Sequence, residues 1–200
     1  MKLKVWLGVC AIVLSSLAAF AQEPKKKEMS AEEKAAMEAM MKAGTPGEQH
    51  KQLASFVGTW DATVKSYMQP GAPPQVSHGT ATNKAILGGR YVQTEFSGDF
   101  MGMPYNGMGY WGYDNVKKQY VATWMDNMST AVMMTTGKMD GPNQYTFTGS
   151  ATDPMTGKDM PFTEKWTATD NDHNTFEMWG PAPDGKMFKM MEISYTRKKS

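Results

Sequence analysis

Three charged residues, Arg90, Asp126 and Glu164, are candidates for a polar centre inside the folded chain. Each falls in or beside a stretch of alternating apolar and polar residues, where side chains can point into an interior. A buried arginine must find a carboxylate, because an unpaired charge in an apolar interior costs several kcal/mol. A pair between Arg90 and a carboxylate could bind the polar end of an apolar ligand. It could equally be a structural tie, and the sequence leaves both interpretations open.

The sequence lacks the motifs of several other kinds of catalytic site. The sequence contains no Gly-x-Ser-x-Gly, no His-Glu-x-x-His and no P-loop. The stretch 107–112, GMGYWG, has the glycine spacing of a dinucleotide fingerprint, which needs a strand before it and a helix after it. Here it falls inside an expected strand, so we interpret its glycines as relief of crowding or as a bend of the strand at a barrel corner. We therefore expect no catalytic residue and no cofactor.

Histidine and methionine suggest two other kinds of binding site, for haem and for copper, with less support. Some ten-stranded barrels hold haem through a single histidine, and the chain has His50, His78 and His173. The glycine-rich repeat after the first tryptophan, which marks the nitrobindin-like group of such barrels, is absent here. Of the 20 methionines, Met101 and Met103 could place two thioethers on one strand face for Cu(I). We instead interpret methionine as adaptable apolar filler and expect no metal.

Residues 1–21 have the features of a secretory signal peptide. Lys2 and Lys4 precede an apolar run over 5–17, which is shorter than the roughly 20 residues that span a bilayer. Small residues before Gln22 fit the cleavage rule. We predict an exported protein, periplasmic or secreted, that has no membrane-spanning segment after cleavage.

The mature chain would carry little net charge and no thiol. The only cysteine, Cys10, lies within the leader, so neither disulfides nor thiol chemistry are expected. Of 21 Lys and Arg, Lys2 and Lys4 leave with the leader, so that 19 remain against 20 Asp and Glu and the net charge is −1. A nearly neutral chain with two arginines is a poor candidate for nucleic acid, and we expect no such partner.

Two helix signals precede the rest of the chain. Residues 22–44 are interpreted as a polar linker and a mobile amphipathic helix, which Ser30 and Glu33 begin as a capping box. Residues 45–200 are predicted to form the folded domain. It opens with a second helix whose apolar stripe must pack on a core, and we expect this helix to cap a β-domain.

From Gly58 onward, short alternating runs are separated by clusters of Gly, Asp, Asn and Pro, which is typical of strands and turns. The absence of a helical period disfavours parallel βαβ units. Closing the sheet would remove its two edges, so we predict a mainly β fold: a single antiparallel up-and-down barrel of about ten strands. A two-sheet sandwich is the alternative. The predicted strands are 59–68, 75–86, 90–98, 104–113, 119–126, 131–138, 144–151, 161–169, 174–180 and 186–197.

Alternation along these strands predicts which side chains share a face. Tyr120, Ala122, Trp124 and Asp126 share one, and Glu164 and Trp166 share another, so each face mixes large apolar groups with a polar one. Such a lining suits an interior that holds a small molecule, and equally an interior filled by side chains. A cavity of about 300 Å³ or more would favour binding. The candidate ligand-binding residues are Arg90, Tyr110, Tyr120, Trp124, Asp126, Glu164 and Trp166.

Several motifs together resemble a known family. They are His50-x-x-Leu53-x-x-Phe56-Val57-Gly58-Thr59-Trp60, Leu87-Gly88-Gly89-Arg90-Tyr91, Gly109-Tyr110-Trp111-Gly112-Tyr113-Asp114 and Thr123-Trp124-Met125-Asp126-Asn127. In this order they are similar to the bacterial family called domain of unknown function 1579, from about residue 50 to the C-terminus. The resemblance implies a calycin-like or lipocalin-like barrel of unestablished activity, so it supports a fold and contributes little to the chemistry.

The Gly58-Thr59-Trp60 stretch also resembles the Gly-x-Trp start of lipocalins and fatty-acid-binding proteins. In those families an arginine of the last strand packs on the tryptophan and closes one barrel end. The resemblance implies that Arg197 lies over Trp60, a cation–π contact worth about 0.5–2 kcal/mol. The first and last strands would then be neighbours.

Three functions are compatible with these patterns. The leading hypothesis is non-enzymatic binding of a small, mostly apolar molecule in the barrel. The second is an enzyme, a hydrolase or isomerase that uses Arg90, Asp126 or Glu164 as its polar centre. The third is a structural or envelope-interaction protein with a filled barrel, whose 30–43 helix docks on a partner.

Overall fold

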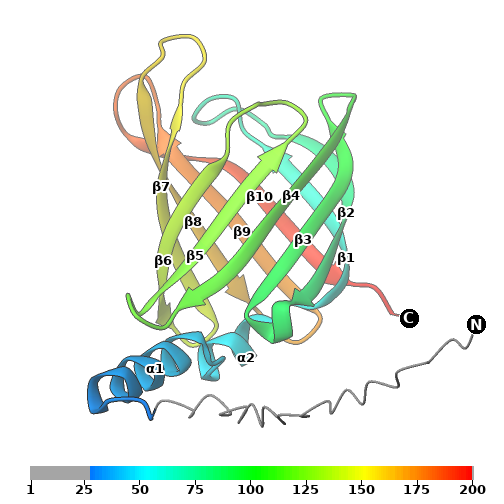
Figure 1. The fold of residues 1–200 in the computed structure, drawn as a ribbon. Helices are drawn as coiled ribbons and strands as arrows, with labels where there is room; N and C mark the ends of the chain where they lie inside the picture. Colours follow the sequence, from blue (N-terminus) through cyan, green and yellow to red (C-terminus); the bar gives the residue numbers. More distant parts are fainter. Residues whose placement is uncertain (1–27, 200) are drawn as a thin grey trace, which may run out of the picture.

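In the computed structural model, which describes residues 28–199, ten antiparallel strands form one closed barrel (Figure 1). The predicted signal peptide, 1–21, and the start of the predicted linker lie outside the described residues. Within the described part of the chain, no helix is both long and apolar enough to cross a bilayer. The elements are α1 (Ala31–Gly44), α2 (Glu48–Ala54), β1 (Gly58–Ser66), β2 (Gln75–Ile86), η1 (Leu87–Gly89), β3 (Tyr91–Phe100), β4 (Met103–Asp114), β5 (Gln119–Asp126), β6 (Met133–Gly141), β7 (Gln144–Thr152), β8 (Asp159–Ala168), β9 (His173–Pro181) and β10 (Met187–Arg197).

Every strand pairs with its sequence neighbour, and β1 also pairs with β10, which closes the barrel. In that closing pair Trp60 lies opposite Arg197 and Ala62 opposite Tyr195. The predicted up-and-down barrel is thus confirmed, and the sandwich alternative is wrong. The predicted strand bounds differ most at β6, where a register shift before Gly141 lets pairing with β7 continue to the end of the hairpin.

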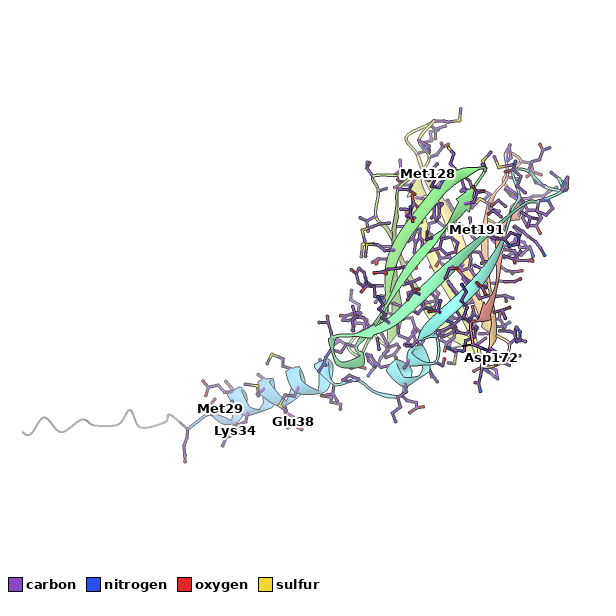
Figure 2. All side chains as sticks on the ribbon, turned by 90° about the vertical axis from the view of Figure 1, so that its right-hand side faces the viewer. Met29, Lys34, Glu38, Met128, Asp172 and Met191 are labelled. Carbon is purple, nitrogen blue, oxygen red and sulfur yellow. The ribbon has the colours of Figure 1, made fainter. Side chains whose placement is uncertain are left out.

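The two helices differ in what they bury. The capping box at Ser30 forms, with Ser30 N donating to Glu33 Oε2 at 2.7 Å and Glu33 N donating to Ser30 Oγ at 3.1 Å. No residue of α1 is buried, and Figure 2 shows this helix extending away from the barrel. The shorter α2 buries His50 and Leu53 and covers one barrel end. The predicted cap is therefore present, because α2 has an apolar side to bury and α1 does not.

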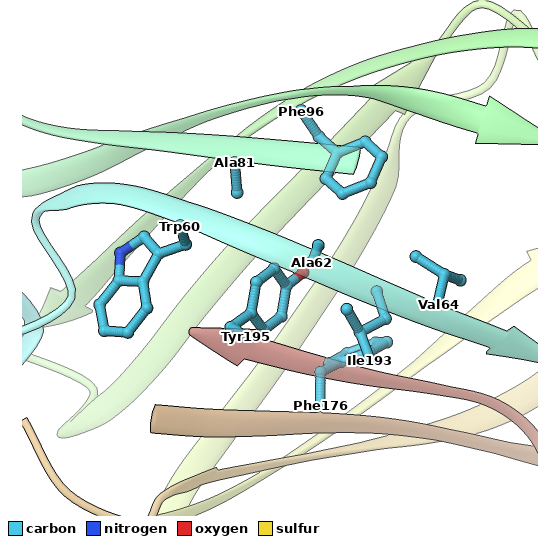
Figure 3. Packing of buried hydrophobic residues seen from close by; sticks show 8 residues of the cluster. All are labelled: Trp60, Ala62, Val64, Ala81, Phe96, Phe176, Ile193 and Tyr195. Atoms are coloured by element: carbon cyan, nitrogen blue, oxygen red, sulfur yellow. The ribbon is translucent and has the colours of Figure 1, made fainter. Parts of the chain in front are cut away.

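Inward-facing side chains form two clusters. One lies at the α2 end, where it fills the interior; it consists of Leu53, Phe56, Val92, Trp111, Tyr120, Tyr145 and Phe147. The other covers the inner wall of β1, β2, β3, β9 and β10, as Figure 3 shows; it consists of Trp60, Ala62, Val64, Ala81, Phe96, Phe176, Ile193 and Tyr195. Their strand residues follow from the strand period of two, which turns alternate residues toward the barrel axis, whereas Leu53 and Phe56 come from α2 and the turn after it.

Candidate functional site

The interior of the barrel is hollow in the half away from α2. A cavity of ≈ 340 Å³ lies there and reaches the surface beside Asp99, Phe100 and Met128, which belong to hairpins at the end opposite α2. A barrel filled throughout, the basis of the third hypothesis, is therefore not what the structure contains. The cavity is lined by Val64, Thr94, Phe96, Asp99, Phe100, Tyr105, Trp111, Ala122, Thr123, Trp124, Asp126, Met128, Met133, Thr135, Glu164, Trp166, Phe176, Met178, Met191, Ile193 and Tyr195.

The floor of the cavity is a group of aromatic rings that hold one another in place. The Trp166 ring lies 4.2 Å from that of Trp111, 4.7 Å from that of Phe176 and 5.8 Å from that of Tyr195, centroid to centroid. Edge-to-face and stacked pairs of this kind contribute about 0.5–1.5 kcal/mol each beyond their burial. The floor is thus an apolar surface whose rings are fixed by their mutual packing.

A short hydrogen-bond chain crosses the wall near the mouth. Trp124 Nε1 donates to Tyr105 Oη at 2.9 Å, and Tyr105 Oη donates to Asp126 Oδ2 at 3.0 Å. Asp126 Oδ1 also accepts from the Met128 backbone N–H at 2.9 Å. Burial raises the pKa of the Tyr105 hydroxyl, with Asp126 adding to the shift, so this hydroxyl stays protonated at neutral pH.

The position of Trp124 in this series of hydrogen bonds depends on two glycines of β4. A Cβ added at Gly107 would lie 2.3 Å from Cζ2 of Trp124, and one at Gly109 would lie 2.9 Å from its Cε3. The Trp124 indole therefore lies flat against the strand in space that side chains would otherwise take. This confirms that the 107–112 glycines relieve crowding and lie inside a strand.

Glu164 is the most weakly hydrogen-bonded of the three carboxylates that line the cavity. Its carboxylate accepts one hydrogen bond from the described side chains, from Thr135 Oγ1 at 3.4 Å, which is long. It forms no ion pair with a described residue. Burial raises the pKa of Glu164 to about 7, and the hydrogen bond from Thr135 opposes this only in part. The group therefore exchanges its proton near neutral pH, inside an apolar cavity.

Four of the predicted ligand-binding residues line the cavity together: Trp124, Asp126, Glu164 and Trp166. Arg90 does not. It is exposed at the α2 end, where Nε donates to the carbonyl of Gly44 at 2.8 Å and Nη1 to that of Leu87 at 3.0 Å. The expected pair between Arg90 and a carboxylate does not form, because the η1 turn directs this arginine to the carbonyl of Gly44, the last residue of α1, which has no acceptor role within the helix.

Two predicted tyrosines also lie away from the cavity. Tyr120 is buried in the α2-end cluster, and its hydroxyl donates to Gln52 Oε1 of α2 at 2.7 Å. Tyr110 lies on the outer face of β4, since its neighbour Trp111 points inward and successive residues alternate. Tyr120 therefore joins the barrel to its cap, and neither residue reaches the candidate site.

The histidines are spread over other parts of the fold. His50 is buried in α2, where Nδ1 accepts from the Gly47 N–H at 3.0 Å, whereas His78 and His173 are exposed. Among residues 28–199, none of the three histidines lines the cavity. That part of the chain also holds no group of three or more His, Cys, Asp or Glu side chains suited to a metal ion.

Sequence reasoning missed six polar residues of the cavity: Thr94, Asp99, Tyr105, Thr123, Thr135 and Tyr195. Tyr195 could have been found from closure, because it lies opposite the inward Ala62 in the β1–β10 register. Thr135 carries no comparable signal, since many outward positions of these strands are also threonines.

Fold and cavity together define a small closed β-barrel with an interior that opens at one end. Residues 45–197 match the family described as "Protein of unknown function (DUF1579)", and the chain belongs to this family. No curated protein matches the sequence. The crystal structure of Rv2717c from M. tuberculosis has a similar fold, with a TM-score of 0.54 and 14% identity over 78% of this chain and 100% of that one.

Two further solved structures are more distantly similar. A redesigned β-barrel is 15% identical over 74% of this chain and 96% of its own, with a TM-score of 0.39. A protein with unknown function from the DUF3598 family of Nostoc punctiforme is 7% identical over 76% of this chain and 100% of its own, with a TM-score of 0.22.

Proposed function

We propose that this is an exported protein that binds a small, mostly apolar molecule inside its barrel and does not transform it. The observation that carries the proposal is the cavity of ≈ 340 Å³, whose walls are mainly aromatic and aliphatic with a few polar groups. Sites for small organic ligands have this composition and a volume of about 300 Å³ or more.

The walls of the cavity are also held in place by the barrel itself, and such preorganisation favours high affinity. Hydrogen bonds of the closed barrel fix the backbone of every lining strand, and packed rings fix the floor. A ligand therefore orders few side chains when it binds, so little of its binding free energy is lost to conformational entropy.

The enzyme hypothesis has less support. It expected Arg90 and two carboxylates to converge on empty space, and Arg90 lies at the other end of the barrel. Glu164 has a pKa suited to proton transfer, but no activated nucleophile among the described residues adjoins it, and its one hydrogen bond, from Thr135, is long.

Binding can be tested with a dye that fluoresces in apolar surroundings, such as N-phenylnaphthylamine. We expect saturable binding to the full mature chain and its loss in Ala122→Phe, whose added ring would occupy the cavity. Val121→Phe is the matched control, because Val121 is the outward neighbour on β5 and does not line the cavity. Thermal unfolding of both variants shows that each is folded. Absence of dye binding to the wild-type protein, or equal binding by both variants, would refute the proposal.

Native mass spectrometry of protein isolated from its own host extends this test to the natural ligand. We expect an added mass that disappears on denaturation. The same preparation tests export: the proposal expects the chain to begin at Gln22 and to be found outside the cytoplasm. An intact Met1 on the bulk of the protein would contradict the export part alone.

A further inference from the structure

We propose that the ligand carries a protonated amine, which pairs with the Glu164 carboxylate inside the cavity. This inference rests on the proposed function, since it names the chemical class of the molecule that the barrel would hold. The charged side chains that line the cavity are all acidic.

The lining includes three carboxylates, those of Asp99, Asp126 and Glu164, and among the described residues it includes no Lys, Arg or His. None of the three forms an ion pair with another described residue. An anionic ligand would meet like charge at every depth of the cavity. A cationic one would meet opposite charge throughout, and such complementarity selects between otherwise similar ligands.

Glu164 is the carboxylate with most to gain from a cation. Asp126 already accepts two hydrogen bonds, at 2.9 and 3.0 Å, and Asp99 is exposed at the rim, where it accepts from the Gly102 N–H at 3.0 Å. Glu164 is more deeply placed and has a single long hydrogen bond. An ammonium group donates three hydrogen bonds and would satisfy both its charge and its free acceptor positions.

The walls suit the rest of such a molecule. The rings of Trp111, Trp124 and Trp166 line the same cavity as Glu164, and aromatic faces attract organic cations. The methionine and aliphatic residues toward the mouth can contact an alkyl chain. An amphiphile would thus place its amine at the aromatic floor and its tail toward the opening.

Protonation of Glu164 gives the inference a pH signature. Of the groups that share the cavity, the Tyr105 and Tyr195 hydroxyls stay neutral, because burial raises the pKa of both. Glu164 has a pKa of about 7 in the empty protein, so below that pH an amine must displace a proton to form the pair. An alkylamine keeps its own proton until about pH 10. Amine affinity should therefore rise about tenfold from pH 6 to pH 8.

The test compares decylamine, decanol and decanoic acid by calorimetric titration of the full mature chain at pH 8. These probes have ten carbons each and carry a cationic, a neutral and an anionic head group. We expect decylamine to bind at least tenfold more tightly than decanoic acid. Glu164→Gln should remove most of this preference while leaving decanol affinity within about twofold. Glu95→Gln, which removes an exposed carboxylate of β3, is the matched control and should change nothing.

The outcomes separate the two levels of the proposal. Equal or tighter binding of the acid would overturn the amine inference and leave apolar binding intact. An amine preference that survives Glu164→Gln but is lost in Asp126→Asn would overturn the assignment to Glu164. If none of the three probes binds and the dye does not bind either, the proposed function fails and the inference fails with it.

Discussion

The guanidinium carbon of Arg197 lies 4.0 Å from the ring centroid of Trp60, so the last strand packs on the first tryptophan of the barrel. This is the arrangement that the Gly-x-Trp resemblance implies. The arginine also donates to backbone carbonyls just after α2, from Nη1 to Val57 at 2.6 Å and from Nη2 to Ser55 at 2.8 Å. It therefore ties barrel closure to the segment that joins α2 to β1.

Arg197→Lys should destabilise the protein by about 1–3 kcal/mol, because lysine cannot stack on Trp60 and donate to both carbonyls at once. Urea unfolding of the mature chain measures the change. Arg90→Lys is the control, since this second arginine is exposed and should cost under about 1 kcal/mol. Equal losses of unfolding free energy in the two variants would show that the contact with Trp60 does not stabilise the protein measurably.

Gly107→Ala should disturb the Trp124 indole, because the new methyl would lie 2.3 Å from Cζ2 of that ring. We expect a loss of about 1–3 kcal/mol in stability and a shift in tryptophan emission as the indole moves. Gly141→Ala is the matched control: its nearest neighbour, Gln144 Oε1, would be at 3.8 Å, an ordinary contact. If Gly107→Ala behaves like the control, the glycine is not what places the indole.

The fold was predictable because one of its causes is local and the other applies to any antiparallel sheet. A period of two and turn residues at regular spacing produce the strands, and the need to remove exposed edges produces closure. The site was predictable only in part. Alternation assigns a face but not a depth, so Tyr120 was grouped with Trp124 although it lies beneath the cavity, against α2.

Two further features of the site could not be predicted from the sequence: which face of β4 is buried, and where the turn before β3 directs Arg90. The β4 strand has aromatic residues at both inward and outward positions, such as Trp111 and Tyr110, so its pattern does not reveal which face is buried. The direction of Arg90 is set by the η1 turn, in which Gly88 and Gly89 have φ of 67° and 78°. Turns of this kind depend on tertiary contacts, here with the end of α1, that no strand pattern encodes.

A chain that begins at Thr45, and so lacks α1, should unfold with a free energy within about 0.5 kcal/mol of that of the mature protein, because no residue of α1 is buried. A chain that begins at Gly58 is the contrasting variant. It also loses Leu53 and Phe56, which are 2% and 4% exposed, and should lose more than about 3 kcal/mol or fail to fold. A large loss on removing α1 alone would mean that the helix packs on the barrel in solution.

The raised pKa of Glu164 predicts how stability depends on pH. Because its pKa is about 7 in the folded protein and 4.5 is its ordinary value, the folded state binds the Glu164 proton more tightly than the unfolded state does. Its contribution to stability is complete below the ordinary value and is lost as pH rises through 7. Between pH 5 and pH 8 the wild-type protein should therefore lose roughly 2–3 kcal/mol relative to Glu164→Gln.

The comparison with Glu164→Gln isolates this carboxyl, because other titrating groups, including His50 with its lowered pKa, are the same in both proteins and cancel. Unfolding by urea at several pH values gives the difference curve, which should change between pH 4.5 and pH 7, with its midpoint at about pH 5.8, and level off above pH 7. A flat difference would mean that the carboxyl is hydrated or paired in solution. Saturating decylamine should flatten the curve as well, because an ammonium beside Glu164 stabilises the ionised form that burial alone disfavours.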